Sequence, residues 1–296
     1  MPIDPIADQN CVRRFLLDEA DDARVATVRL TQALSAMLDH QAMPTPVFSL
    51  CGELAAAACL LADMLKFKGE MIIQLKGDGP VSLLVADCNS EGQVRATAQW
   101  STLDDSLSFQ DLVGAGYLAV TADPEHGERY QGIVPLDGSS LADCLNHYFA
   151  SSEQLDTRIY LAADTQQAGG LLLQRLPREA HSNRQEDTWD TLHILADTVG
   201  PDELKTLAGP PLAYRLFHGQ TIRRLDPWPV QFGCSCSRDR SARALRSLGK
   251  SDVESLFASQ STVTVDCHFC GQVYQYDQAD IEWLLSDQPP GPDTLQ

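Results

Sequence analysis

Four cysteines near the end of the chain place the strongest constraint on the fold. Cys234-x-Cys236 is followed some thirty residues later by Cys267-x-x-Cys270. Zinc binds four thiolates tetrahedrally, and two close pairs of cysteines supply these ligands once folding brings the pairs together. The spacing therefore predicts a site for one zinc ion per chain.

The two cysteine pairs differ in their expected local structure. The second pair is predicted to form a zinc knuckle between two strands, because valines alternate before it over 263–265 and apolar and aromatic residues follow it over 273–276. The first pair is less regular. In an extended strand Cys234 and Cys236 would point to the same face, so both sulfurs reach one ion only where the backbone bends.

The spacing leaves the role of the metal open between a static structural zinc, a zinc released by oxidation and a catalytic zinc. Four thiolates leave no open coordination position, which disfavours catalysis. A disulfide between Cys234 and Cys236 would close a very small ring and carry strain, and strained disulfides are typical of regulation. No nucleophile elbow and no paired-histidine motif occurs, so no catalytic residue is predicted.

A basic run follows the first cysteine pair in an otherwise acidic chain. One interpretation is that these cations keep the thiolates deprotonated and sensitive to oxidants. The other is that they form the solvated face of an ordinary helix. The run comprises Arg238, Arg240, Arg243, Arg246 and Lys250.

Composition limits the partners and the compartment. A net charge of −19 is repelled by phosphate backbones, so no nucleic-acid partner is expected. The odd total of nine cysteines, five of them at no metal-like spacing, indicates a reducing compartment. The N-terminus does not read as a signal peptide, and the longest apolar run is interrupted by Asp63 and Lys66. We therefore expect a cytoplasmic protein without a membrane partner.

Strand-like and helix-like segments alternate over the first 176 residues, which predicts an α+β domain with a mixed or antiparallel sheet. Three short strands separated by turns indicate an antiparallel meander. The expected strands are 24–30, 71–76, 81–87, 93–99, 117–121, 130–134, 158–163 and 170–174, and the expected helices are 31–40, 52–68 and 139–150.

The segment 177–231 is predicted to be a helical linker. Its first helix carries an apolar stripe, and two shorter helices are expected at 202–207 and 212–218. Helices this short are marginal in water, so they depend on docking to the main domain and to the zinc module, or else form a permanently packed helical subdomain. The stripe consists of Trp189, Leu192, Leu195 and Val199.

The last part of the chain is predicted to be a zinc module at 232–286, with a helix at 241–248, a last helix after Asp277 and a disordered tail at 287–296. A module of this size has little core. Zinc binding, about 10–16 kcal/mol in small peptides, would therefore supply most of its folding free energy.

The sequence around the cysteines resembles the redox switch of the heat shock protein 33 family, the redox-regulated 33 kDa chaperonins. The matching residues are Phe232-Gly-Cys234-Ser-Cys236-Ser-Arg-Asp-Arg240 and Val265-Asp-Cys267-His-Phe-Cys270. Upstream segments resemble the core domain of the same family. These are Gly52-Glu53-Leu-Ala-Ala, Gln74-Leu-Lys-Gly77-Asp-Gly-Pro-Val81 and Gly169-Gly-Leu-Leu-Leu-Gln174.

The resemblance implies an ATP-independent holdase that is inactive while reduced and zinc-bound. It implies that Cys234, Cys236, Cys267 and Cys270 bind the zinc ion. It also implies that oxidation pairs Cys234 with Cys236 and Cys267 with Cys270 and releases the zinc. The implied partners are unfolded client proteins and, in the active state, a second copy of the chain.

The apolar stripe of the first linker helix, Trp189, Leu192, Leu195 and Val199, is our hypothesis for a client-binding surface uncovered on activation. Two other classes of function remain open. A thiol oxidoreductase would use the same cysteines for turnover, and a static zinc ribbon would act as a scaffold for a protein partner.

Overall fold

The computed structural model describes residues 9–17, 23–104, 106–152, 155–177, 187–259 and 261–280. The chain forms two compact units, Met1–Gly233 and Cys234–Gln296. The predicted tail at 287–296 and the predicted last helix beyond residue 280 lie outside the described residues.

The first unit contains two six-stranded sheets. One has the order β10-β1-β2-β9-β8, with β11 also pairing with β1, and all of its pairs are antiparallel. Its strands are β1 (Cys11–Leu17), β2 (Ala23–Leu30), β8 (Thr157–Ala163), β9 (Ala168–Arg175), β10 (Ile222–Arg224) and β11 (Trp228–Pro229). We call this the linker-side sheet.

The second sheet has the order β12-β5-β4-β3-β6-β7 and contains the predicted antiparallel meander as β3, β4 and β5. Only β12 runs parallel to its neighbour, so the sheet is mixed. Its strands are β3 (Gly69–Gly77), β4 (Val81–Asn89), β5 (Gln93–Trp100), β6 (Gly116–Pro124), β7 (Tyr130–Pro135) and β12 (Gln231–Phe232). The predicted α+β fold class is confirmed.

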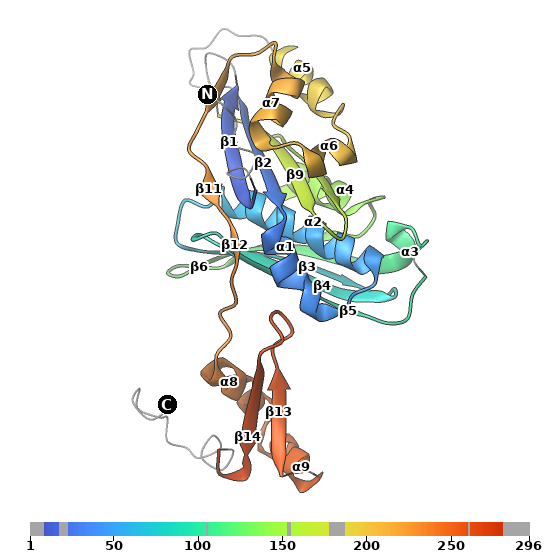
Figure 1. Cartoon of the computed structure of the whole chain (residues 1–296), viewed down its shortest axis with the longest axis vertical. Coiled ribbons are helices and arrows are strands. Elements are labelled where there is room, and N and C mark those ends of the chain that lie inside the picture. The colour runs from blue at the N-terminus through green and yellow to red at the C-terminus, as the bar shows by residue number, and fades with distance from the viewer. Residues whose placement is uncertain are drawn as a thin grey trace. The chain divides into compact units, whose positions relative to one another are not determined.

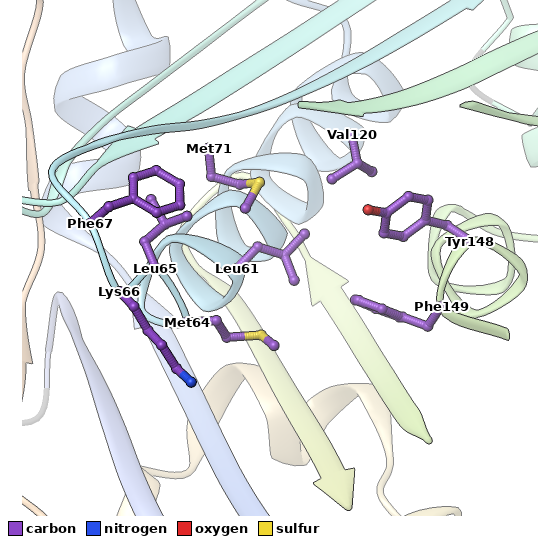
Figure 2. A pocket seen from close by; sticks show the side chains of 9 residues that line it. All are labelled: Leu61, Met64, Leu65, Lys66, Phe67, Met71, Val120, Tyr148 and Phe149. Carbon is purple, nitrogen blue, oxygen red and sulfur yellow. The ribbon is translucent and has the colours of Figure 1, made fainter. Parts of the chain in front are cut away.

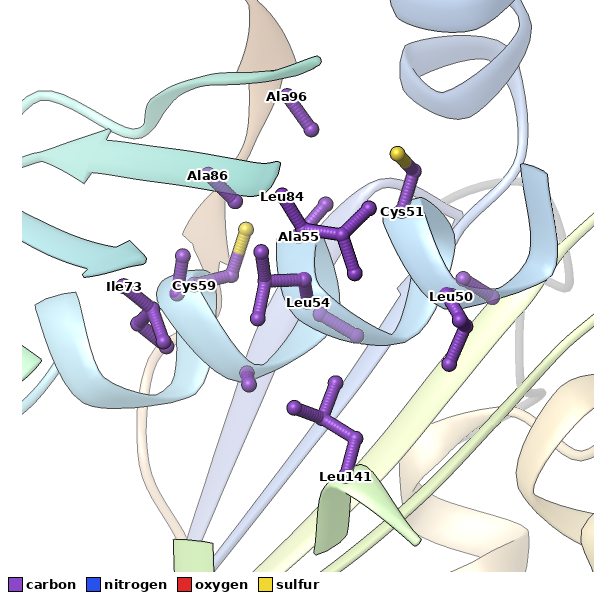
Figure 3. Packing of buried hydrophobic residues seen from close by; sticks show 14 of the residues in the cluster. Leu50, Cys51, Leu54, Ala55, Cys59, Ile73, Leu84, Ala86, Ala96 and Leu141 are labelled. Carbon is purple, nitrogen blue, oxygen red and sulfur yellow. The ribbon is translucent and has the colours of Figure 1, made fainter. Parts of the chain in front are cut away.

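A single apolar helix, α2 (Thr45–Ala62), lies between the two sheets (Figure 1). Its alanines allow both sheets to approach closely, and its larger side chains fill the space between them. Figure 3 shows Leu50, Cys51, Leu54, Ala55 and Cys59 of α2 among side chains of β3, β4, β5 and of α4 (Leu141–Ser152). Burial on all sides explains why this helix carries so few polar residues.

The bounds and composition of α2 correct two expectations. The helix begins at Thr45 and ends at Ala62, whereas 52–68 was predicted, because Pro46 lies in the first turn, where proline is favoured, and does not precede the helix. With 18 residues and a mean hydropathy of 1.6, α2 is also long and apolar enough to cross a membrane. Since 78% of it is buried inside the protein, it serves as a core helix.

The linker helices cover the outer face of the linker-side sheet. They are α5 (Asp187–Ala196), α6 (Pro201–Thr206) and α7 (Gly209–Phe217). Leu192, Leu212, Leu216 and Phe217 are buried there, and Trp189, Leu195 and Val199 pack on the same cluster as half-buried residues. From the strands come Phe15, Leu17, Val25, Leu171 and Leu173.

The end of the predicted linker is not helical. After α7 the chain extends along the sheets as β10, β11 and β12, which the sequence pattern did not predict. Strand β1, the short helix α3 (Phe109–Val113) and the short helix η1 (Asp39–Gln41), which follows α1 (Gln32–Leu38), were also not predicted as separate elements. The division of the first unit into a core and a metastable linker remains a prediction.

The second unit packs two helices against a hairpin. It comprises α8 (Arg238–Leu248), α9 (Lys250–Ser259), β13 (Thr262–Asp266) and β14 (Val273–Asp277). Helix α8 begins three residues before the predicted start because Ser237 caps it, accepting a hydrogen bond from the Arg240 N–H at 3.2 Å. Its buried core among the described residues is small, consisting of Ala242, Leu245, Val253, Val263 and Tyr276.

Glu53, within the core helix α2, gives a testable pH dependence. Burial raises the pKa of this carboxyl to about 7. The folded state then binds a proton more tightly than the unfolded chain, so the free energy of unfolding falls as the pH rises from about 4.5 to 7. At 1.36 kcal/mol per pKa unit, E53Q is expected to stabilise the protein by about 3 kcal/mol at pH 8 and to have little effect at pH 4.

Urea unfolding of the parent and E53Q at both pH values measures this difference. The exposed Glu91 provides the control variant, E91Q, for which no such pH-dependent gain is expected. Equal gains for E53Q at pH 4 and pH 8 would contradict the argument.

Candidate metal centre

The four predicted cysteines come together in the second unit. The Sγ atoms of Cys234 and Cys267 are 3.6 Å apart, and those of Cys236 and Cys270 are 3.4 Å apart. All four sulfurs lie within 4.8 Å of one another, and all four residues are half-buried. Tetrahedral zinc with Zn–S bonds of roughly 2.3 Å requires sulfurs about 3.8 Å apart. The donor set and its spacing therefore fit a single zinc ion.

The second cysteine pair lies on a tight turn between β13 and β14. The N–H of Gly271 donates to the Cys267 carbonyl at 2.8 Å, and the N–H of Cys267 donates to the Gln272 carbonyl at 2.9 Å. Gly271 has a φ of 69°, a left-handed conformation that glycine adopts without strain. This turn brings both sulfurs to one side, as expected of a knuckle.

The first pair lies on an irregular stretch directly before α8. The Arg240 guanidinium donates to the Ser235 hydroxyl, so the residue between the two cysteines is held by the first turn of the helix. Because the backbone is neither strand nor helix here, Cys234 and Cys236 can both direct their sulfurs to one point. The bend required by the Cys-x-Cys spacing is thus stabilised by the helix that follows.

A side chain from β14 also contacts one of the sulfurs. The Tyr274 hydroxyl on β14 donates to the Cys236 Sγ at 3.2 Å. This hydrogen bond raises the pKa of Tyr274, because the phenol can donate it only while it keeps its proton. The sequence pattern identified Tyr274 only as a strand residue, since nothing in the spacing shows which way its hydroxyl points.

The thiols differ in how their surroundings affect ionisation. Burial raises the pKa of Cys267 and of Cys270. Burial acts in the same direction on Cys234, but hydrogen bonds to its sulfur from the Cys236 N–H and from the neighbouring thiols outweigh it and lower the pKa. A bound dication favours the thiolate form of every ligand, which overrides these differences.

The basic run contributes to the framework of the second unit. Arg238 donates to the Gln275 carbonyl at 2.8 Å and to the Asp280 carboxylate at 2.7 Å. Its guanidinium also lies 4.5 Å from the centre of the Tyr276 ring, a cation–π contact. Arg243 and Arg246 are exposed on α8. These positions favour a structural and solvated role for the run over direct control of the thiolates.

A cavity of about 370 Å³ lies at the end of α2 and is lined by apolar and aromatic side chains with one lysine (Figure 2). Its lining contains no cysteine and no histidine. It consists of Leu61, Met64, Leu65, Lys66, Phe67, Met71, Val120, Tyr148 and Phe149.

The Tyr274 hydroxyl is expected to strengthen metal binding. Partners in the outer shell of a metal site typically change affinity by about ten- to a hundredfold, so we expect Y274F to bind zinc about tenfold more weakly. Competition with a chromophoric chelator under reducing conditions measures the affinity. V273A, at the exposed neighbouring position, is the control. An unchanged affinity in Y274F would show that the sulfur gains nothing from this hydrogen bond.

Comparison with known proteins identifies the family of the chain. The model of the family described as Hsp33 protein matches residues 10–277. The 33 kDa chaperonin of Ectopseudomonas mendocina is 46% identical over 279 residues, which cover 93% of this chain and 94% of the relative. The 33 kDa chaperonin of Azotobacter vinelandii is 43% identical over 95% of this chain and 96% of its own length.

The fold is also similar to that of a solved structure. The crystal structure of the 33 kDa chaperonin from Thermotoga maritima superposes with a TM-score of 0.78 and covers 93% of this chain and 97% of its own, at 20% identity. From the family match and the extent of these similarities, we conclude that the chain belongs to the Hsp33 family of chaperones.

Proposed function

We propose that this chaperone is a redox-regulated, ATP-independent holdase that binds zinc and is inactive when reduced. The observation that carries the proposal is the meeting of four thiols within 4.8 Å on a unit with only five buried apolar side chains among its described residues. Such a unit depends on its metal for folding, and its metal ligands are groups that oxidants convert into disulfides.

The proposed oxidation consumes two equivalents of hydrogen peroxide. Each equivalent takes two electrons from a pair of zinc-bound thiolates and two protons from solvent, forming one disulfide and two molecules of water. From the family resemblance we propose the pairs Cys234–Cys236 and Cys267–Cys270. Since all four sulfurs lie within 4.8 Å of one another, their spacing does not select this pairing over another. Sulfurs in disulfides no longer offer thiolates to zinc, so oxidation and release of the metal are one event.

The linker helices supply the proposed second step. α5, α6 and α7 have 10, 6 and 9 residues, lengths that are marginal without tertiary contacts. We propose that unfolding of the zinc module loosens them and uncovers apolar surface for unfolded client proteins. Trp189, Leu192, Leu195 and Val199 remain our proposed client-binding residues on the helices. They lie on the linker-side sheet and not at the metal centre.

The remaining partners follow from charge and family. We propose a cytoplasmic protein that forms a homodimer when oxidised and binds neither nucleic acid nor membrane, in keeping with its net charge of −19. We propose no catalytic turnover, because the four cysteines of the second unit converge on one another as a closed set of metal ligands.

Zinc release measured alongside chaperone activity tests the proposal. The reduced protein is treated with peroxide at raised temperature in the presence of a chromophoric chelator, and light scattering of a thermally unfolding client is followed in parallel. We expect one zinc released per chain together with suppressed scattering. Retained zinc with unchanged scattering would favour a static zinc scaffold, and turnover of a model disulfide would favour an oxidoreductase.

A further inference from the structure

The edge of strand β1 is covered by two very short strands from the end of the linker. β1 has seven residues, whereas β10 has three and β11 has two. The segment between the two short strands leaves the ladder at Asp226 and Pro227. Pro227, in this interruption, lacks the N–H that a strand donates. The covering segment is therefore a poor strand on a long edge.

The hydrogen bonds show which groups of β1 face this edge. The N–H of Leu225 donates to the Arg14 carbonyl at 2.9 Å, and the N–H of Val230 donates to the Asn10 carbonyl at 2.8 Å. In an antiparallel pair such hydrogen-bonded positions alternate along the strand. The backbone groups of Val12, Arg14 and Leu16 consequently face the covering segment, and those of Arg13, Phe15 and Leu17 face β2.

The same edge adjoins the apolar surface under the linker helices. Phe15 and Leu17 are buried in that cluster, and Ile222 of β10, which pairs with Leu17, packs against it. Arg224, which pairs with Phe15, is instead exposed. An extended chain with an apolar side chain at every second position would match this edge better than the native segment does.

The covering segment is also directly connected to the metal ligands. β12 follows β11, pairs with β5 through Gln231 and Phe232, and is separated from Cys234 by Gly233 alone. The Gly233 N–H donates to the Val94 carbonyl at 3.2 Å. Loss of order at Cys234 therefore starts next to the strands that cover the two sheet edges.

We propose that the edge of β1 is a client-binding edge that β10 and β11 occupy in the inactive state. Once the linker leaves, an extended client segment with alternating apolar residues adds to β1 as an antiparallel strand. Backbone hydrogen bonds give affinity that does not depend on the client sequence, which suits a chaperone with many clients. The inference deepens the proposed function and rests on its linker-opening step.

Residue-resolved hydrogen exchange on the full-length protein tests the edge. Oxidation with zinc release is expected to remove protection from the amides of Val12, Arg14 and Leu16, and added client is expected to restore it. The amides of Arg13, Phe15 and Leu17 are expected to stay protected through β2. Unchanged protection of all six amides, in a sample that has released zinc and suppresses client aggregation, would overturn this inference and leave the proposed function intact.

Peptide binding to the oxidised protein provides the second readout. The probe is a fluorescent, end-blocked peptide of alternating valine and threonine. Its control is N-methylated at every residue, so that neither edge of the peptide can pair with a strand. We expect the probe to bind and the control not to bind. L16P removes one outward N–H and should weaken binding about fivefold, the effect of one hydrogen bond, whereas L16A keeps the N–H and should bind like the parent.

Three further results would overturn the proposal. Equal binding of the probe and its N-methylated control would show that edge pairing plays no part. Restored protection of Val12, Arg14 and Leu16 by raised protein concentration alone would assign the edge to a second copy of the chain. Retained zinc with no suppression of scattering would overturn the proposed function, and this inference with it. If L16P fails to fold, the exchange measurement and the N-methylated control still test the proposal.

Discussion

Removing the metal from the reduced protein is expected to unfold residues 234–280 and to leave the first unit folded. The reason is that the apolar core of the second unit is small, so bound metal supplies most of its folding free energy. Five buried apolar side chains form its core among the described residues, against the dozens that surround α2. Structural zinc supplies about 10–16 kcal/mol in small peptides, more than a core of this size provides.

A strong chelator under reducing conditions provides the test, with C267S as a variant that removes one ligand without any chelator. In NMR spectra the resonances of the second unit are expected to collapse to unfolded positions, while those of β2, β9 and the core helix keep their dispersion. S247A, at an exposed position on α8, is the control and should keep its metal. A second unit that stays dispersed without metal would show that its apolar core suffices for folding.

The metal ligands could be predicted from the sequence because their constraint is local and chemical. Two short cysteine spacings determine a four-thiolate site wherever the intervening segments fold. The meander β3–β4–β5 could also be predicted, since alternation and turn residues specify it within a short stretch. In both cases the information lies in neighbouring residues.

The structure adds elements that are defined by their partners. β10 and β11 are too short to show a strand pattern, and they are strands because β1 offers them an edge. The donor role of the Tyr274 hydroxyl depends on the register of β13 with β14, in which Val265 pairs with Tyr274. The start of α2 was misplaced because Pro46 can either precede a helix or lie in its first turn. These features depend on tertiary pairing, which a local sequence pattern does not show.

F217A is expected to act as a holdase without oxidation and without losing zinc. Phe217, the last residue of α7, is fully buried in the cluster between the linker helices and the linker-side sheet. Truncating a buried phenylalanine to alanine costs about 3–5 kcal/mol. The linker helices are short and derive their stability from this packing, so a loss of this size should undock them.

The control lies on the same helix. Tyr214 is 68% exposed, so Y214A removes an aromatic ring of similar size without opening the cluster, and it should stay inactive when reduced. Light scattering of a thermally unfolding client measures activity, and hydrogen exchange over 187–217 measures docking. If F217A exposes the linker yet leaves the client to aggregate, opening the linker is not sufficient for activity. If the linker helices of F217A stay protected from hydrogen exchange, the packing at Phe217 is not what keeps them docked on the linker-side sheet.

Metal removal and the F217A variant together establish the order of events. Metal removal acts first on the second unit, and in the proposed mechanism the activity that follows passes through the linker. F217A acts on the linker alone, with all four cysteines unchanged. Zinc content of one ion per chain in an active, reduced F217A would therefore place the cysteines upstream of the linker as a sensor. Activity in F217A only after zinc is lost would mean that the metal centre restrains the client-binding surface by itself.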